Sequence, residues 1–501
     1  MNSSRHALSR RLFLHALGIV FVIAFASLRV QQDGLIGGRG VWPAAETIEG
    51  LRPLGFTQAP TLFFFTGASD SMLHFACNAG LLFSSLLALG LYPLPLLALC
   101  WALYLSLTIA GSVFMGFQWE SLLLESGLTA LFFCADHPLT PLWRNRHEPP
   151  RLARYLQLWL LIRLMFLSGL VKLTSGDSTW RTLAALDVHY FTQPLPGPLS
   201  WSVHQLASLH RPATLTMFAI ELGAPILLLI PGRLRRAGAL ALIVLQLCIF
   251  ATGNYGFFNL LSLALCVPAL DDALLEKVLP FRLAHRLGDN VTQASAGRAR
   301  ATRSFCVLGA LVIIPVSSVE ALSRVAPRLP VPAFLESLSS AVSPLRSINS
   351  YGLFAVMTTE RDEIVLEGSR DGKEWRDYRF GYKPGALDEN PSQVAPHQPR
   401  LDWQMWFAAL GSYRRNPWYL EFLQRLLEGE PGVLGLLRDN PFPEGPPRYL
   451  RSRFFRYRFS TPEERRSDHH VWERDELAPY APTVTLENGR LAAARLPDVI
   501  P

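Results

Sequence analysis

The sequence carries little charge for its length. Of its 501 residues only 17% are charged, and half are hydrophobic. A soluble globular domain has about a quarter of its residues charged, so this composition excludes a purely soluble globule and indicates a polytopic membrane protein. The net charge of +7 would favour a nucleic-acid partner in a soluble protein. Here the basic residues fall mostly in short loops and in the C-terminal third, so we expect no nucleic acid.

Cysteine is scarce, and none of it occurs in a reactive spacing. There are six cysteines, all in or beside apolar runs, and no CxxC is present: Cys77, Cys100, Cys134, Cys248, Cys266 and Cys306. Cysteine in such runs is usually a small hydrophobic residue, which excludes a thiol–disulfide catalyst. The chain also lacks a GxxxxGK[ST] loop and any HExxH or HxxxH spacing. We therefore expect no ATP, no metal and no cofactor.

Long apolar runs recur along the first two thirds of the chain. They lie at 12–28, 72–90, 94–112, 117–134, 154–172, 213–230, 236–251, 256–270 and 304–321. A transmembrane helix needs about 20 such residues, so the runs predict about nine transmembrane helices. The first run follows Arg5, Arg10 and Arg11 without a small-residue cleavage site after it, which is typical of an uncleaved signal anchor. The run at 117–134 contains Glu120 and Glu125 and is open to a second interpretation, a re-entrant segment.

The number of basic residues in successive loops alternates between high and low, as nine spans require. With the N-terminus inside, the inner loops hold clusters at 144–154, 233–236 and 277–303, whereas the outer loops at 113–117 and 251–256 hold no basic residue. Positive charge gathers on the cytoplasmic side, so nine spans place the C-terminus outside. Only four of the basic residues are lysines, a bias typical of a GC-rich bacterial genome. We expect an integral protein of the bacterial cytoplasmic membrane, or of the endoplasmic reticulum membrane if the source is eukaryotic.

The C-terminal third has the composition of a soluble domain. We divide the chain into a transmembrane domain at 1–326, a Pro/Ser-rich linker at 327–346 and an extracytoplasmic domain at 347–501. Strand chemistry occurs at 351–359, 363–368 and 375–382, with a hairpin signal at Ser369–Gly372, and 448–459 alternates basic and aromatic residues at strand period. Helices are predicted at 401–410 and 418–427. The domain is expected to be β-rich and sandwich-like.

Three predicted spans carry an ionisable residue near their middle. These residues are Glu125, Arg163 and Glu221, which are expected at similar depth. A charge in hydrocarbon costs a few kcal/mol or more, so Arg163 needs a partner. Pairing that merely allows the helices to insert and a relay for protons or substrate require the same groups, and both interpretations stay open.

The loop after Arg163 is rich in ionisable and aromatic residues. With Trp180 and Tyr190 among them, these residues favour a shaped surface at a membrane face. The ionisable ones, with Glu120, could form a cluster on the outer face: Glu120, Lys172, Asp177, Asp187, His189 and also His204. Each has a structural explanation of its own, because Lys172 at a span end can reach the interface and Asp177 can cap a turn. Their concentration on one side favours a shaped cleft. No nucleophile–base–orienter spacing is evident.

A second candidate surface lies at 394–413. Trp403 and Trp406 are three residues apart on a predicted helix, with Arg400 beside them and Tyr413 beyond. This pattern fits a helix packed on a sheet, and it also fits a docking surface for another polypeptide, since aromatic and Arg residues favour interface hot spots. The strand at 448–459 could in addition contact anionic lipid headgroups.

Over nearly its whole length the chain resembles the lipase maturation factor family. The blocks that carry the resemblance are GLIGGRGVWPA (34–44), FQWESLLLESG (117–127), LVKLTSGDSTW and LDVHYFTQPLPGPLSW within 158–201, ATGNYGFFNLLSLALC (251–266), INSYGLFAVMTTERDEIVLEGSRDGKEW (348–375), YKPG (382–385) and VAPHQPRLDWQMWFAALG (394–411). The resemblance implies a membrane-embedded factor that helps secreted lipases reach an active state. It is not itself a lipase, and no GxSxG occurs.

The resemblance and the residues together predict a folding factor. The expected partners are membrane lipids and a secreted lipase or another exported protein. The expected contact residues are Asp177, Trp180, Asp187, His189, Tyr190, Arg400, Trp403, Trp406 and Tyr413. No catalytic residue is assigned. The alternative is an intramembrane enzyme acting on a lipid or quinone-like substrate, distantly like the vitamin K-dependent carboxylase membrane domain. In that case Lys172 and His189 would be acid/base groups. A transporter is a third hypothesis.

Overall fold

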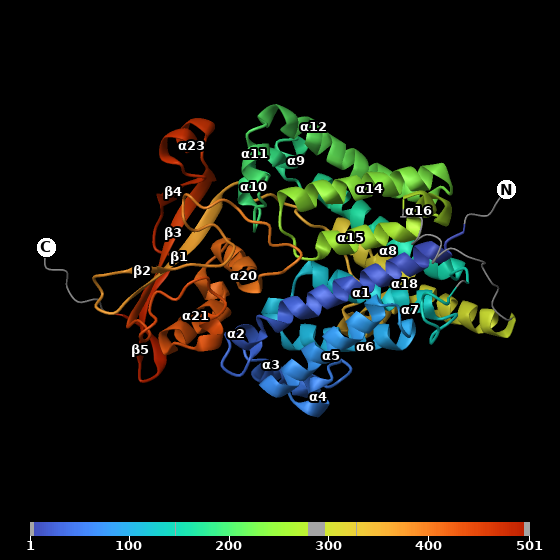
Figure 1. Cartoon of the computed structure of the whole chain (residues 1–501), viewed down its shortest axis with the longest axis horizontal. Coiled ribbons are helices and arrows are strands. Elements are labelled where there is room, and N and C mark those ends of the chain that lie inside the picture. The colour runs from blue at the N-terminus through green and yellow to red at the C-terminus, as the bar shows by residue number, and fades with distance from the viewer. Residues whose placement is uncertain (1–4, 146, 279–295, 327, 495–501) are drawn as a thin grey trace.

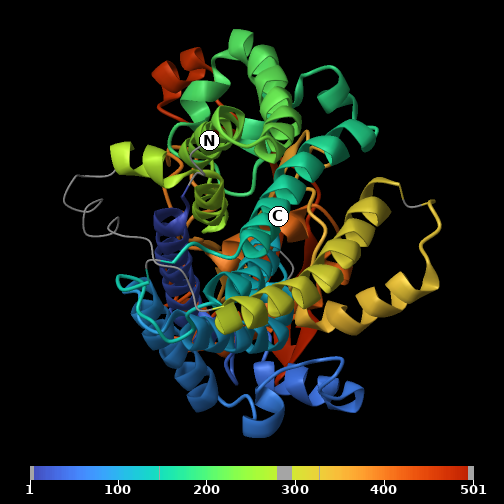
Figure 2. The ribbon, with the colours of Figure 1, turned by 90° about the vertical axis from the view of Figure 1, so that its right-hand side faces the viewer.

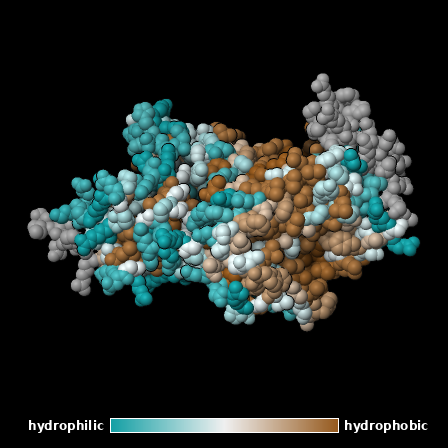
Figure 3. Space-filling model, turned by 60° about the horizontal axis from the view of Figure 1, so that its bottom comes forward, coloured by the Kyte–Doolittle hydropathy of each residue, from teal (hydrophilic) through white to brown (hydrophobic). Residues whose placement is uncertain are grey.

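A computed structural model describes residues 5–145, 147–278, 296–326 and 328–494. Helices occupy one end of the elongated molecule and a β-sheet the other (Figure 1). On the face shown in Figure 3, apolar side chains cover the helical part and hydrophilic ones prevail over the sheet. The composition therefore separates the chain into a part suited to hydrocarbon and a part suited to water.

Seven helices of the described residues are long and apolar enough to cross a membrane. They are α1 (Ala7–Arg29), α5 (Asp70–Ala88), α6 (Pro93–Ala110), α8 (Arg151–Thr174), the run Ala207–Leu229, α14 (Arg233–Thr252) and α18 (Ala296–Val325). The run Ala207–Leu229 consists of α12 (Ala207–Phe218), a π-helical turn η3 (Ala219–Gly223) and α13 (Ala224–Leu229). The remaining two predicted spans are shorter helices, α7 (Gln118–Cys134) and Phe258–Ala269. The helical membrane domain is confirmed.

Helix α1 lies inside the bundle. Phe13, Phe21 and Phe25 are fully buried, and the Arg10 guanidinium, also buried, pairs with Asp136 at 2.8 Å. The helix packs against α5 and against Phe258–Ala269, which comprises α15 (Phe258–Cys266) and η4 (Val267–Ala269). The segment predicted as a signal anchor is therefore a central element of the fold.

The hinge between the second and third spans is a tight helical hairpin. Helix α5 ends before Gly90, whose φ of +84° is a left-handed conformation, and α6 begins at Pro93 in the first helical position.

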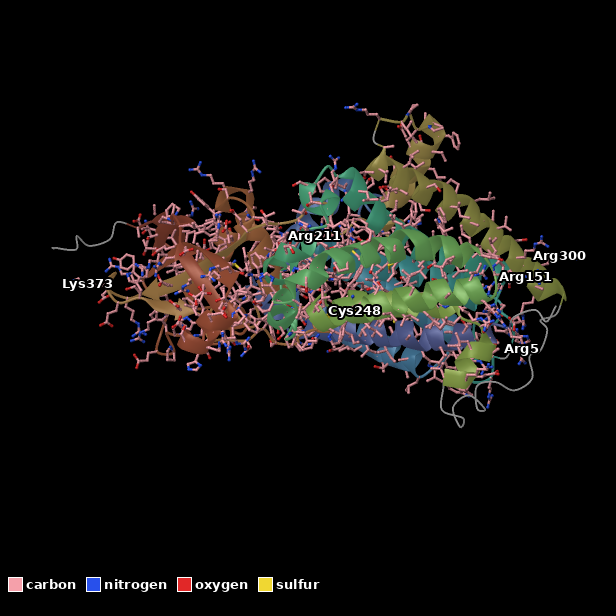
Figure 4. The ribbon with its side chains drawn as sticks, turned by 90° about the horizontal axis from the view of Figure 1, so that it is seen from above. Arg5, Arg151, Arg211, Cys248, Arg300 and Lys373 are labelled. Atoms are coloured by element: carbon pink, nitrogen blue, oxygen red, sulfur yellow. The ribbon has the colours of Figure 1, made fainter. Side chains whose placement is uncertain are left out.

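At the end of the bundle remote from the sheet lie Arg5, Arg151 and Arg300, whereas Lys373 lies at the tip of the sheet domain (Figure 4). The basic loops and the C-terminal domain are thus at opposite ends of the bundle.

Short helices surround the end of the bundle that meets the sheet. They are α2 (Gln32–Ile36), α3 (Ala44–Leu51), η1 (Arg52–Leu54), α4 (Phe63–Thr66), η2 (Ser112–Met115), α9 (Ser178–Arg181), α10 (Ala185–Thr192) and α11 (Ser200–His204). Figure 1 shows α9 to α11 on one side of this end and α2 to α4 on the other. At the opposite end lies α16 (Asp272–Val278).

The C-terminal domain is built on one antiparallel sheet. Its six strands are β1 (Arg361–Ser369), β2 (Arg376–Tyr378), β3 (Tyr449–Phe459), β4 (Trp472–Glu476), β5 (Ala481–Glu487) and β6 (Arg490–Ala493). Their order is β2-β1-β3-β5-β6, and β4 pairs with β3 beside Phe455–Phe459. The predicted hairpin is confirmed, because β1 pairs with β2 from Gly368↔Arg376 to Leu366↔Tyr378.

Helices α20 (Arg400–Ala409) and α21 (Pro417–Glu428) pack on this sheet. Both are confirmed as helices, with η6 (Tyr413–Arg415), α22 (Pro431–Leu434) and α23 (Pro462–Asp468) completing the domain. The domain is β-rich as predicted, but the sandwich is wrong. All strands of the described residues belong to one sheet, and helices cover it where a second sheet was expected.

Strand β3 is central, with β1 on one side and β4 and β5 on the other. The alternation seen in the sequence is confirmed, since Phe455, Tyr457 and Phe459 are buried and the arginines between them are more exposed. Arg456 pairs with Asp362 at 2.9 Å and Arg458 with Glu464 at 2.7 Å. These arginines are therefore engaged by carboxylates of the domain itself.

The predicted strand at 351–359 is wrong. This stretch consists of turns and extended backbone, and Phe354 has φ of +53°. Its polar backbone groups are bound by side chains of the bundle: Asp177 accepts a hydrogen bond from the Met357 N–H, and the Trp180 indole donates one to the Phe354 carbonyl. Its apolar composition serves burial between helices, with no strand ladder.

Residues 333–345 of the predicted linker are helical. They form α19 (Ala333–Val342) and η5 (Ser343–Leu345), and α19 packs beside α18. Figure 2 shows α18 and α19 standing out from one side of the bundle. From η5 the chain returns into the bundle before it enters the sheet.

Helix α2, near the start of the chain, packs closely against α22 of the C-terminal domain. A Cβ added to Gly34 in α2 would lie 2.1 Å from the carbonyl oxygen of Gly432 in α22. We expect Gly34→Ala to destabilise the protein by about 1–3 kcal/mol through overpacking, seen as a lower melting temperature in detergent. The control is Gly50→Ala in α3, where nothing lies within 4 Å. Equal melting temperatures for the two variants would contradict the packing described.

Candidate functional site

Glu125 and Arg163 form a buried ion pair between α7 and α8. The pair is completed by the chain that returns from η5. Arg163 donates to the Asn349 carbonyl at 2.9 Å, while Glu125 accepts from the Asn349 N–H at 3.0 Å and from the Tyr351 hydroxyl at 2.6 Å. Residues 349–351 are therefore part of the core of the membrane domain.

Glu221 does not belong to this pair, and its predicted grouping with Glu125 and Arg163 is wrong. Glu221 lies in the π-helical turn, and each of its two carboxylate oxygens accepts a hydrogen bond from the Lys172 ammonium at 2.7 Å. Lys172 is nine residues beyond Arg163 on α8, roughly 13 Å along the axis. A similar depth of Glu221 and Arg163 within their predicted spans was therefore not enough to identify Lys172 as the partner of Glu221.

Lys172 is buried in the last turn of α8, so the expectation that it extends to the membrane interface is wrong. Its ammonium lies 5.4 Å from the centroid of the Trp180 ring, a cation–π geometry. Trp180 is itself buried against Phe218 and donates to the Phe354 carbonyl. The pair Lys172–Glu221 thus joins the end of α8, where the loop 173–212 begins, to the π-helical turn η3.

Asp177 fixes the first turn of this loop. Its carboxylate accepts from the Thr179 N–H at 2.7 Å, which caps α9, and from the Met357 N–H at 2.6 Å. Burial acts to raise the pKa of Asp177, but these hydrogen bonds outweigh it, and the pKa lies below its usual range. The predicted capping role of Asp177 is confirmed, and the cap also holds the chain at Met357.

His189, Asp187 and Tyr190 lie on α10, in three different environments. Asp187 is exposed and pairs with His210 at 2.8 Å. His189 is half-buried, 3.3 Å from the Tyr255 hydroxyl. Tyr190 is buried against β3 and β4. Of these three predicted contact residues, Asp187 is the one that the structure leaves open to a partner.

Next to the loop 173–212, the C-terminal domain contacts the bundle along a surface that we call the junction. On the bundle side it comprises residues 113–120, 190–196 and 254–256, and on the other side residues 361–363 and 392–406. Buried polar side chains of the junction that were not among the predicted site residues include Arg361, Glu363 and Asn254. The signal for Asn254 was its place in the block at 251–266. For Arg361 the signal was the charged start of a strand whose centre, Ile364–Leu366, is apolar.

Arg361 binds the bundle through its guanidinium. It donates to three carbonyl groups within 191–194, at distances from 2.5 to 2.9 Å, and to the Glu363 carboxylate at 2.7 Å. Both side chains are fully buried. Burial lowers the pKa of Arg361, and the Glu363 charge opposes that effect. One residue of β1 therefore fixes the end of α10 against the sheet.

Asn254 makes a second set of contacts across the junction. Its carbonyl oxygen accepts from the Val394 and Ala395 N–H groups at 2.8 and 2.9 Å, and its amide donates to the Pro196 and Ser392 carbonyls. All four hydrogen bonds join backbone to one buried side chain. The amide thus acts as a bridge between three distant segments of the chain.

Glu120 and Arg400 form the third connection. The two side chains are buried and 2.7 Å apart, and Arg400 also donates to the Phe114 carbonyl at 2.7 Å. Glu120 was expected in an outer-face cluster and Arg400 on a contact surface. Both side chains are buried in the junction, so the expectation of an exposed contact residue at Arg400 is wrong. A carboxylate in the first turn of α7 and a guanidinium at the start of α20 can each be buried because they meet.

The tryptophans of α20 also face inward. Trp403 is 4% exposed with its ring centroid 4.7 Å from that of Trp119, and Trp406 is 8% exposed and donates to the Thr192 carbonyl. The expectation that they are exposed contact residues is wrong, because the bundle covers this face of α20. Tyr413, beyond the helix, is half-buried.

The described residues contain no group of three or more His, Cys, Asp or Glu side chains placed to hold a metal ion. The six cysteines are free thiols, and five of them are buried. What the junction offers chemically is a rigid connection. It joins a hydrophilic sheet domain to one end of an apolar bundle.

Such a bundle with a docked β-rich domain defines an integral membrane protein with a large domain on one side. A model of the lipase maturation factor transmembrane domain matches residues 8–277, and one of the lipase maturation factor C-terminal domain matches 347–482. The chain belongs to the lipase maturation factor family, as its sequence blocks predicted.

Individual relatives match over most of their length. Lipase maturation factor 2 of Homo sapiens is 36% identical over 603 residues, covering 96% of this chain and 83% of that protein. Lipase maturation factor 1 of Bos taurus is 33% identical over 510 residues, covering 96% and 90%. Lipase maturation factor 1 of Homo sapiens is 33% identical, covering 96% and 89%. No solved structure matches the chain.

The pair Glu120–Arg400 gives a direct test of the junction. Removing one partner leaves the other charge buried, which costs about 3–5 kcal/mol, whereas replacing both by apolar residues costs much less. We expect Glu120→Leu and Arg400→Met each to lower the melting temperature strongly and the double variant to recover most of the loss. The control is Arg370→Ala at an exposed pair with Glu444, worth about 0–1 kcal/mol. Additive losses in the double variant would refute the pairing.

His189 makes stability depend on pH. Burial, and less strongly the Lys172 ammonium, lower the pKa of His189 from 6.5 to about 4. The unfolded chain therefore takes up a proton between pH 6.5 and 4 that the folded chain refuses, so stability falls as the pH falls through this window. We expect His189→Gln to reduce this fall, measured as melting temperature from pH 7.5 to 4.5. The control His469→Gln, at an exposed site, should follow the wild type. A His189→Gln profile parallel to the wild type would contradict the assignment.

Proposed function

We propose that this chain is a maturation factor for secreted lipases or similar exported proteins. It binds the folding client on the side of the membrane that carries the C-terminal domain. The client class comes from the relatives, which are named for the maturation of lipases. The observation that carries the proposal is the junction. Its buried contacts from Arg361, Asn254 and Arg400 fix a hydrophilic domain to the membrane bundle. A client can therefore be held at a fixed height above the bilayer.

The side of the membrane follows from charge. Arg5, Arg151 and Arg300 lie at the end of the bundle remote from the sheet domain (Figure 4). Short loops rich in arginine remain in the cytoplasm. The C-terminal domain then lies on the extracytoplasmic side, which is the compartment that secreted clients traverse.

The client surface that we propose differs from the one predicted from sequence. Helix α20 turns Trp403 and Trp406 into the junction and leaves Phe407 43% and Leu410 49% exposed. The Phe407 ring packs edge-to-face against Trp406, with centroids 5.0 Å apart. We call Phe407, Leu410 and Tyr413 the α20 patch. Exposed apolar side chains on an otherwise hydrophilic domain mark an interaction site.

The proposed mechanism is binding without catalysis. The α20 patch covers apolar surface that the client buries only after it has assembled, and dissociation follows when the client covers that surface itself. Lys172 and His189, the acid/base groups of the enzyme hypothesis, are held by Glu221 and Tyr255. Their contacts support a role in positioning the loop 173–212.

The α20 patch can be tested in cells that secrete a lipase. We expect Phe407→Asp with Leu410→Asp to lower crosslinking of the client to a photoreactive residue at Tyr413 at least tenfold, and lipase activity with it, while abundance of the factor is unchanged. A tenfold loss corresponds to about 1.4 kcal/mol of binding.

The control is Tyr382→Asp, which introduces the same charge at another exposed aromatic of the domain, 42% exposed. It should leave crosslinking and lipase activity near the wild-type level. Full client activity with Asp at both 407 and 410 would exclude the patch. Equal losses from the control would show that charge on the domain, not this patch, is the cause.

A further inference from the structure

Helices α18 and α19 stand out from one flank of the bundle (Figure 2). An apolar groove lies between α18 and α7 on this flank. It has a volume of about 120 Å³, and the residues that form it include Leu128 and Phe132 of α7, Gly309, Val312 and Ile313 of α18, and Leu345 of η5. Ser347 is the one polar side chain among the lining residues, and its hydroxyl is bound to the Trp101 indole and to the Leu345 carbonyl. The groove therefore offers nothing for water to bind, since a buried water needs two to four polar partners.

The surroundings of the groove are hydrocarbon. On α18, Leu308 is 65% exposed and Leu311 64% exposed, and Phe334 of α19 is also exposed. Such side chains on a membrane-spanning helix face lipid tails. The space between α7 and α18 is thus open to the apolar chains of the bilayer.

A cation stands next to the groove. Arg346 follows Leu345 directly, and its backbone is left-handed, with φ of +49°. This conformation costs a residue with a side chain about 1–2 kcal/mol. The half-buried guanidinium donates one hydrogen bond, to the Thr108 carbonyl at 3.2 Å, and no carboxylate in the described part of the chain pairs with it. A cation at the edge of hydrocarbon needs an anion, and the bilayer supplies phosphate.

The depths of cation and groove match a lipid. Thr108 is two residues from the end of α6, so the Arg346 guanidinium that binds its carbonyl lies at about the depth of that residue, roughly 3 Å from that end of the helix. Leu128 and Phe132 lie 10 and 14 residues beyond Gln118, at the adjoining end of α7, about 15 and 21 Å inward. Half of the hydrocarbon core is about 15 Å thick. A phosphate at Arg346 therefore places the end of its acyl chain in the groove.

We propose that this groove binds one acyl chain of a phospholipid from the leaflet on the side of the C-terminal domain, with Arg346 binding its phosphate. The guanidinium matches phosphate geometry and is always charged. The lipid fills the space between α7 and α18 and holds the α18–α19 hairpin against the bundle. This site does not depend on the proposed client binding.

The experiment uses the full chain in nanodiscs that contain a phosphatidylcholine with a photoreactive group near the end of one acyl chain. After illumination, mass spectrometry locates the labelled peptides. We expect labels in 128–132 and 309–313. Val312→Trp fills the groove and should lower this labelling at least fivefold. Leu311→Trp, a matched change on the exposed side of the same helix, should leave it unchanged.

The phosphate contact has its own pair of variants. Arg346→Gln should lower groove labelling about fivefold, while Arg328→Gln, at an exposed arginine before α19, should not. If Val312→Trp does not fold, Val312→Phe replaces it as the variant that fills the groove. Equal labelling of Val312→Trp and Leu311→Trp overturns the groove as the site. Equal labelling of Arg346→Gln and the wild type overturns the phosphate contact.

Discussion

A charge inside an apolar bundle has to be paired within the protein, and in this molecule the partners come from far along the chain. Glu125 uses one oxygen for Arg163 and the other for Asn349 and Tyr351. Glu120 uses Arg400. Since neither carboxylate is stable alone in that environment, the membrane domain is incomplete without residues that the sequence assigns to the C-terminal third. The two parts of the chain are therefore one structural unit.

The same constraint explains the shape of the loop 173–212. Its first turn is held by Lys172–Glu221 and by Asp177, and its middle by the guanidinium of Arg361, which binds carbonyl groups within 191–194. Between these fixed points Tyr190 packs on the sheet. A loop of this length is usually mobile, but here buried polar contacts fix its start and its middle. It forms a wall beside the C-terminal domain, and its composition of aromatic and charged residues follows from that position.

The sequence predicts those features of the structure that depend on neighbouring residues, and it does not predict contacts between residues that are far apart in the chain. Apolar period and length predict the long helices, and the alternation at 448–459 predicts β3, because these depend on local chemistry. The partner of Glu221 could not be predicted, since depth along a span does not say which helix is adjacent. For Trp403 and Trp406, a spacing of three predicts a shared helix face but not what covers it. The stretch 351–359 has strand composition, yet side chains from α9 and its cap bind its backbone.

The pairing of distant residues has a consequence for synthesis on the ribosome. Glu120 and Arg400 are 280 residues apart, and Glu125 and Tyr351 are 226 apart. At about 5–20 residues per second, roughly 15 to 60 s pass between the emergence of Glu120 and that of Arg400. During that interval α7 has no partner for Glu120. The nascent helices must therefore wait in a partly assembled state, and a chain that stops before residue 400 never leaves it.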